Sequence, residues 1–132
     1  MSDFMNSDWC FFAFSQNKIF TLGFFILLAA IGSLLRWILQ NRQRSHKFMG
    51  TFLVNVIASF LLGFLLGGSP SGEMITIAGT GFLGSFSTFS TAMMEANDTL
   101  ERQQKLSAVF YLVSSIVAGV AAALLGLEVG AK

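Results

Sequence analysis

Uncharged polar residues crowd the centre of one strongly apolar stretch of the chain. Residues 74–94 include no charged side chain, yet Thr80 to Thr91 read Thr-Gly-Phe-Leu-Gly-Ser-Phe-Ser-Thr-Phe-Ser-Thr. Glycine and hydroxyl residues weaken a lipid-facing helix and free backbone groups. Non-helical backbone is tolerated at membrane depth only where protein buries it or where it lines a polar cavity. The stretch therefore predicts a broken helix around a permeation path or an ion site.

Two further apolar stretches carry polar residues at a spacing of four, which places them on one helix face. These residues are Thr51, Asn55 and Ser59 in one stretch, and Tyr111, Ser115 and Gly119 in the other. Such residues either hold helices together by hydrogen bonds or line a hydrated pore. Their occurrence beside a broken helix favours the pathway.

Arg36 is the single charged residue inside a predicted span, near its cytoplasmic end. One interpretation is a side chain that snorkels to the interface. The other is a positive mouth that attracts anions. Gly32 lies four residues earlier on the same face, so a neighbouring helix could approach Arg36 closely.

The residue types that are missing from the spans also restrict the function. No Asp, Glu or His lies inside a predicted span. A proton-coupled transporter normally needs a buried titratable group, a small multidrug exporter needs a carboxylate in its first span, and a hydrolase needs a base or metal ligands. An enzyme is therefore not expected. Amide, hydroxyl and backbone N–H donors suit a small anion, because conduction requires sites that also release the ion.

Four apolar stretches must position these residues: 19–39, 48–66, 74–94 and 106–127. Each has about the 20 residues that cross ~30 Å of hydrocarbon as a helix, and short connectors make neighbouring helices antiparallel. Hydrophobic residues make up 54% of the chain and charged residues 11%. The sequence predicts an all-α membrane protein with four transmembrane helices in one domain, residues 18–132, after an extension of interfacial character, residues 1–17.

Lysine and arginine residues predict the orientation. The connectors after the first and third spans hold Arg42, Arg44, Lys47, Arg102 and Lys105, whereas the opposite side holds Lys18 and Lys132. Positive residues favour the cytoplasm. We therefore expect a multi-pass cell-membrane protein with both termini outside. The net charge of +1 gives no electrostatic reason to expect nucleic-acid binding.

Three motifs then identify a family. In order they are Gly-Ser-Leu-Leu-Arg-Trp at 32–37, Gly-Thr-Phe-Leu-Val-Asn at 50–55, and Gly-Phe-Leu-Gly-Ser-Phe-Ser-Thr-Phe-Ser-Thr at 81–91. Over residues 19–127 the chain resembles the Fluc (CrcB-type) fluoride channels. The third motif is highly specific to that family.

The resemblance implies a passive fluoride-export channel, built as an antiparallel (inverted-topology) dimer of four-helix subunits with two pores. By this analogy the fluoride pathway comprises Arg36, Thr51, Asn55, Phe89, Ser90, Tyr111 and Ser115. Glu95 matches the family's acidic residue after the third-helix motif. Backbone carbonyls of Gly84 and Ser87, from both subunits, would surround a central structural Na⁺.

The chain departs from the family pattern at two positions. Ser87 replaces a threonine, which should be harmless because its carbonyl is the expected ligand. Ala92 stands where the family has the second of its two pore-lining phenylalanines, so one pore would be altered or closed. With the charge bias, this suggests pairing with a homologous subunit of opposite orientation, in which the chain is a conducting or a modulatory partner. The homodimer is the family's default.

Overall fold

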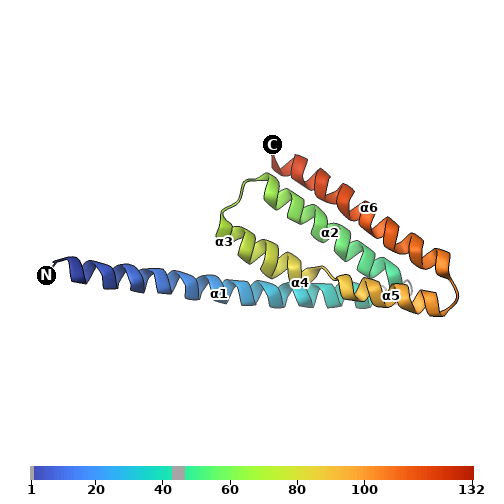
Figure 1. Ribbon diagram of the computed structural model, residues 1–132, viewed down its shortest axis with the longest axis horizontal. Coiled ribbons are helices and arrows are strands. Elements are labelled where there is room, and N and C mark those ends of the chain that lie inside the picture. The colour runs from blue at the N-terminus through green and yellow to red at the C-terminus, as the bar shows by residue number, and fades with distance from the viewer. Residues whose placement is uncertain (1, 43–46) are drawn as a thin grey trace.

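The computed structural model describes the backbone of residues 2–42 and 47–132, and the side chains of residues 18–42 and 48–132. Every regular element in these residues is a helix (Figure 1). The predicted all-α class is confirmed. The side chains of the predicted interfacial extension, residues 1–17, and those of the cations Arg44 and Lys47 lie outside the described side chains.

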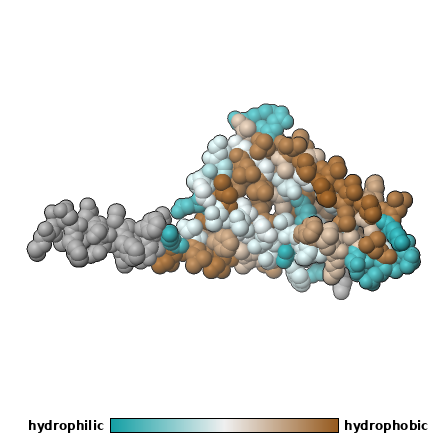
Figure 2. All heavy atoms as spheres, viewed as in Figure 1, coloured by the Kyte–Doolittle hydropathy of each residue, from teal (hydrophilic) through white to brown (hydrophobic). Residues whose placement is uncertain are grey.

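Among the residues that the structure describes, three helices are long and apolar enough to cross a membrane: α1 (Ser2–Arg42), α2 (Lys47–Gly67) and α6 (Lys105–Gly130). Their candidate spans are Lys18–Arg42, Phe48–Gly67 and Lys105–Gly130, and these include the predicted stretches 19–39, 48–66 and 106–127. Most of their large apolar side chains are exposed on the single chain, and brown surface covers much of Figure 2. The backbone of residues 2–17 continues α1, so the extension and the first span share one helix.

The remaining predicted stretch is divided among several elements. The short helix α3 (Gly72–Met74) ends at the first residue of this stretch, and the π-helix η1 (Ile75–Leu83), α4 (Gly84–Phe86) and the first part of α5 (Phe89–Glu101) follow. Between α4 and α5 the backbone is extended at Ser87 (φ −76°, ψ 161°) and at Thr88 (φ −151°, ψ 119°). A π-helix is rare and is frequently found at functional sites. We refer to Ser87 and Thr88 as the interruption.

Glycine permits α2 and α6 to lie side by side along their length (Figure 1). A Cβ atom at Gly63 would overlap the carbonyl oxygen of Ala123, and one at Gly126 would overlap that of Phe60. Helices in lipid gain no hydrophobic driving force from each other, so close van der Waals contact through small residues must hold them. Among the described helices, α2 and α6 therefore share the most extensive contact.

A second contact positions the interruption. Helix α1 packs against η1 and α4, where Gly32 leaves room for the carbonyl oxygen of Phe82. On the other side of α4, Phe86 is buried with Val54 and Ala58 of α2. The interruption is thus held between α1 and α2.

Candidate functional site

The side-chain amide of Asn55 bridges the interruption. Its Nδ2 donates to the carbonyl oxygen of Thr88 at 2.9 Å, and its Oδ1 accepts from the Thr88 backbone N–H at 2.8 Å. Thr88 is 6% exposed, so without Asn55 its N–H would be buried without a partner, whereas its carbonyl, at the N-cap of α5, also accepts the first hydrogen bond of that helix. The side-chain amide of Asn55 thus pairs with the N–H and C=O of Thr88 as a neighbouring peptide group would.

The interruption also removes the helical hydrogen-bond donors of two carbonyl groups. In a continuous α-helix the N–H of Thr88 would donate to Gly84, and the N–H of Thr91 would donate to Ser87. Here the N–H of Thr88 donates to Asn55, and the N–H of Thr91 donates to Oγ1 of Thr88 at 3.3 Å, as in a helix N-cap. The carbonyls of Gly84 and Ser87 are therefore released from these two helical partners.

Arg36 reaches the same region from α1. Its Nη1 donates to the carbonyl oxygen of Ser87 at 3.3 Å, and the side chain is half-buried. A side chain that merely snorkelled would extend to the interface, whereas this guanidinium group turns toward the interruption. Arg36 therefore places a positive charge next to the released carbonyl of Ser87.

A carboxylate nearly two turns into α5 forms a second polar centre. Oε1 of Glu95 accepts from the hydroxyl of Thr51 at 2.7 Å, and Oε2 accepts from the hydroxyl of Tyr111 at 2.7 Å. Thr51 is 1% exposed and also accepts from Nε2 of Gln40 at 3.3 Å. Helices α1, α2, α5 and α6 thus all contribute to this hydrogen-bond network.

Sequence reasoning missed most of this second centre. Glu95 entered by resemblance alone and was not assigned to the pathway, and Gln40 was not considered. A usable signal for Glu95 is its place just after the polar stretch, where a carboxylate must find donors. No comparable signal marks Gln40, because a glutamine at the end of a span is common.

The structure brings together four of the seven predicted pathway residues. Arg36 and Asn55 meet at the interruption, while Thr51 and Tyr111 meet at Glu95. The hydroxyl of Ser115 donates to the Tyr111 carbonyl within α6, at 2.7 Å.

The other two predicted pathway residues, Phe89 and Ser90, lie at the surface of the chain, where the hydroxyl of Ser90 is 3.3 Å from that of Thr88. Phe89 is 76% exposed and Ser90 is also exposed. Ala92, by contrast, is 5% exposed and lies on the buried face of α5 with Ala96 and Thr99. Positions 89 and 92 therefore face different surroundings in this chain.

The Na⁺ site implied by the resemblance can be tested against the donor set. Within the described residues there is no group of three His, Cys, Asp or Glu side chains that could hold a metal. Gly84 and Ser87 instead line a small hollow of about 140 Å³ with Ser59. Carbonyl oxygens suit a hard cation, and these two have lost helical partners. The donors fit the ion, although one chain supplies two carbonyls and Arg36 already contacts one of them.

Comparison with known proteins identifies the family. Residues 23–127 match the family model described as CrcB-like protein, Camphor Resistance (CrcB). A Mycobacterium tuberculosis protein named fluoride-specific ion channel FluC 2 is 42% identical over 105 residues, covering 76% of this chain and 83% of its own. A Geobacillus kaustophilus protein named fluoride-specific ion channel FluC 1 is 37% identical over 102 residues, covering 75% and 88%. The chain therefore belongs to the CrcB-like family, whose named relatives are ion channels and not enzymes.

Proposed function

We propose that the chain is a subunit of a fluoride channel through which F⁻ leaves the cytoplasm passively and so relieves fluoride toxicity. The observation that carries the proposal is the hydrogen-bonded interruption, which sets uncharged dipoles and one guanidinium group among apolar helices. The names of its relatives supply the ion. A dehydrated small anion needs several donors but no tight charge pair, because it must leave again.

The proposed topology has four transmembrane helices. Helices α1, α2 and α6 provide three of them, and the segment from α3 to α5 would cross as a broken third helix. Its irregular backbone is compatible with membrane depth because Asn55 satisfies the buried groups of Thr88. The charge bias supports an orientation in the cell membrane with both termini outside.

The proposed fluoride path runs along the polar groups already described. Arg36 would attract the anion at one end, and amide and hydroxyl donors would then replace its water: Thr51, Asn55, Ser90, Tyr111 and Ser115. Phe89 would present its positive ring edge to the ion. In the single chain the donors of Asn55 and Tyr111 are already engaged, so a passing ion would compete with Thr88 and Glu95 for them.

A second subunit in antiparallel orientation would complete the path. Phe89 and Ser90 are exposed on the single chain, and so is Gly84, a proposed Na⁺ ligand. Exposed polar groups have no hydrogen-bond partner in lipid, and small residues such as glycine are typical of helix–helix contacts. A second subunit would cover these positions. The outward apolar residues of α6 are suited to lipid contact.

A structural Na⁺ would then lie between the subunits. Gly84 and Ser87 of each chain would direct their released carbonyls at it, and the guanidinium group of Arg36 would remain beside the Ser87 carbonyl. When bound, the ion would supply positive charge that compensates the carbonyl dipoles exposed by the interruption.

The test of the proposal is fluoride efflux from liposomes, read with a fluoride electrode. Release of fluoride but not chloride from vesicles with the purified chain is expected. Asn55→Asp should abolish release while the assembled protein elutes unchanged in gel filtration. No fluoride release from an intact assembly, alone or with any paired homologue, would overturn the assignment.

The alternative is a non-conducting or modulatory subunit of a heterodimeric fluoride channel. Two features favour it: the absence of a ring at Ala92 and the orientation bias of lysine and arginine. A homodimer of opposite orientations needs a chain that inserts both ways. Fluoride efflux that appears only when the homologous subunit is present would support this alternative. Robust efflux by this chain without any homologue would exclude it.

A further inference from the structure

Gln40, near the end of α1, contacts one of the two hydroxyl groups that donate to Glu95. Its Nε2 donates to Oγ1 of Thr51 at 3.3 Å, and the same Oγ1 donates to Oε1 of Glu95 at 2.7 Å. A hydroxyl group has one proton, and an ionised carboxylate can only accept. The Thr51 proton is therefore directed at Glu95, and its contact with Gln40 must be one in which Thr51 accepts.

The packing of α1 against α2 places Gln40 beside Thr51. A Cβ atom at Gly50, the residue before Thr51, would lie 3.1 Å from Cα of Gln40. So close an approach of the two backbones is possible because glycine has no side chain. The half-buried Gln40 side chain thus reaches Thr51 from a defined position where the two helices nearly touch.

The face of α1 that bears Gln40 also bears Arg36. The two residues are four positions apart, which places them on one face of the helix. Arg36 donates to the carbonyl oxygen of Ser87 at 3.3 Å, and Gln40 donates to Thr51. One face of α1 therefore supplies a donor to each of the two polar centres.

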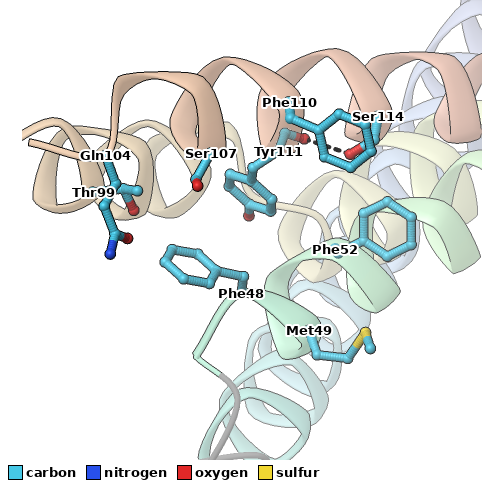
Figure 3. A pocket seen from close by; sticks show the side chains of 9 residues that line it. All are labelled: Phe48, Met49, Phe52, Thr99, Gln104, Ser107, Phe110, Tyr111 and Ser114. Carbon is cyan, nitrogen blue, oxygen red and sulfur yellow. Dashed lines mark hydrogen bonds between the residues drawn. The ribbon is translucent and has the colours of Figure 1, made fainter.

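The two hydroxyl groups that contact Glu95 have different surroundings. Tyr111 lies with Phe48 at the wall of a cavity of about 590 Å³, which is large enough to hold water (Figure 3). Thr51 is 1% exposed and does not line this cavity. Tyr111 thus borders space that water can fill, whereas the hydrogen-bond partners of Thr51 must come from the protein.

We propose that Gln40 is a positioning residue for fluoride conduction, because it holds the Thr51 hydroxyl as an oriented donor. The role rests on the proposed function, in which Thr51 is one of the donors that replace the water of fluoride. A hydroxyl that accepts a hydrogen bond becomes a stronger donor, since hydrogen bonds in a chain polarise one another. Without Gln40, the hydroxyl would also be free to donate to the carbonyl four residues earlier in α2.

Fluoride efflux from liposomes tests the proposal with matched variants. Gln40→Met keeps the approximate size of the side chain but has no N–H, and Gln40→Asn keeps the amide but is one methylene shorter. Both should slow efflux by about two- to ten-fold, the factor that corresponds to one typical hydrogen bond. Gln103→Met makes the same exchange at an exposed position between α5 and α6 and should behave as wild type. Wild-type efflux from both position-40 variants would refute the proposal.

A double-mutant cycle separates positioning from a merely structural role. If Gln40 acts through the Thr51 hydroxyl, adding Gln40→Met to Thr51→Val should slow efflux no further. A further slowing as large as the one that Gln40→Met causes alone would refute the proposal, because Gln40 would then act elsewhere.

An infrared measurement does not depend on conduction. The carboxylate band of Glu95, identified by its loss in Glu95→Gln, should shift in the same direction in Gln40→Met and in Thr51→Val, and should not move in Gln103→Met. A band that stays in place in Gln40→Met would refute the proposal even if efflux were slower. A wild-type protein without fluoride efflux would instead contradict the proposed function, and the position of this band would still decide whether Gln40 orients Thr51.

Discussion

Replacement of Asn55 by alanine should cost more stability than a membrane-protein hydrogen bond usually does. The side chain makes two bonds to one residue, of 2.9 and 2.8 Å, and alanine removes both. Interhelical hydrogen bonds in membranes average about 0.6 kcal/mol each, because the alternative state also finds partners. Two average bonds would therefore give a loss of about 1.2 kcal/mol.

The structure argues for a larger value. Thr88 lies in extended backbone between α4 and α5, so its N–H has no helical partner to return to without rebuilding the interruption, whereas its C=O, at the N-cap of α5, also accepts the first hydrogen bond of that helix. A buried donor or acceptor left without a partner costs about 1–3 kcal/mol. With one such group, the Thr88 N–H, and one further average bond lost, we expect Asn55→Ala to lower the free energy of unfolding by about 2–4 kcal/mol.

Reversible unfolding in mixed detergent with increasing sodium dodecyl sulfate measures this loss. Ser114→Ala is the control, because it removes a 3.0 Å bond to a carbonyl within its own helix and should cost less than about 1 kcal/mol. A loss for Asn55→Ala that equals the control would refute the reasoning, since Thr88 would then have other partners.

Three further outcomes follow from the packing and the polar contacts. Tyr111→Phe should keep the ring next to Phe48, at 5.2 Å between ring centroids, but leave Oε2 of Glu95 without its donor. Unfolding in detergent should therefore show a loss of about 1–3 kcal/mol in the free energy of unfolding. An unchanged unfolding midpoint would mean that water replaces the hydroxyl. Gly126→Leu should prevent the protein from eluting as a stable assembly in gel filtration, because the leucine side chain would meet the Phe60 carbonyl. Gly23→Ala, which has open space around it, should instead raise the free energy of unfolding by about 0.5–1 kcal/mol. A Gly126→Leu protein that assembles normally would disprove the α2–α6 contact. Arg36→Gln should slow fluoride efflux most at low ionic strength, where an anion-attracting charge acts furthest, and a rate difference that is independent of salt would argue for a purely structural role at Ser87.

The sequence was sufficient for the helical class and for three of the spans, because uninterrupted apolar stretches of about 20 residues carry a strong signal. It also located the region of irregular backbone, since glycine and hydroxyl residues replace lipid-facing ones between Thr80 and Thr91. The nine-residue π-helix before Gly84 was not foreseen. Gly32 and Gly81 let α1 and η1 approach each other closely, and this tertiary contact is not encoded by a local pattern.

The site was predictable by residue type more than by role. A stripe of Thr51 and Asn55 indicated polar contacts on one face of α2, but not that one residue would hold a carboxylate and the other a peptide group. Those partners lie 44 and 33 positions away along the chain, so their pairing depends on how α5 is placed. Spacing within a helix identifies a face, whereas tertiary structure decides what the face touches.

Ala92 offers the sharpest test of how this chain differs from its family. Because Ala92 is 5% exposed and lies among the subunit's own side chains, a phenylalanine there must displace that packing rather than enter a pore. Overpacking of a buried position typically costs about 1–3 kcal/mol. We therefore expect Ala92→Phe to lower the unfolding free energy by at least that amount with no gain in fluoride efflux, while Ala92→Ser stays close to wild type. If Ala92→Phe is as stable as wild type and efflux rises, position 92 faces the ion path in the assembled channel, and the buried alanine of the single subunit is exposed by pairing.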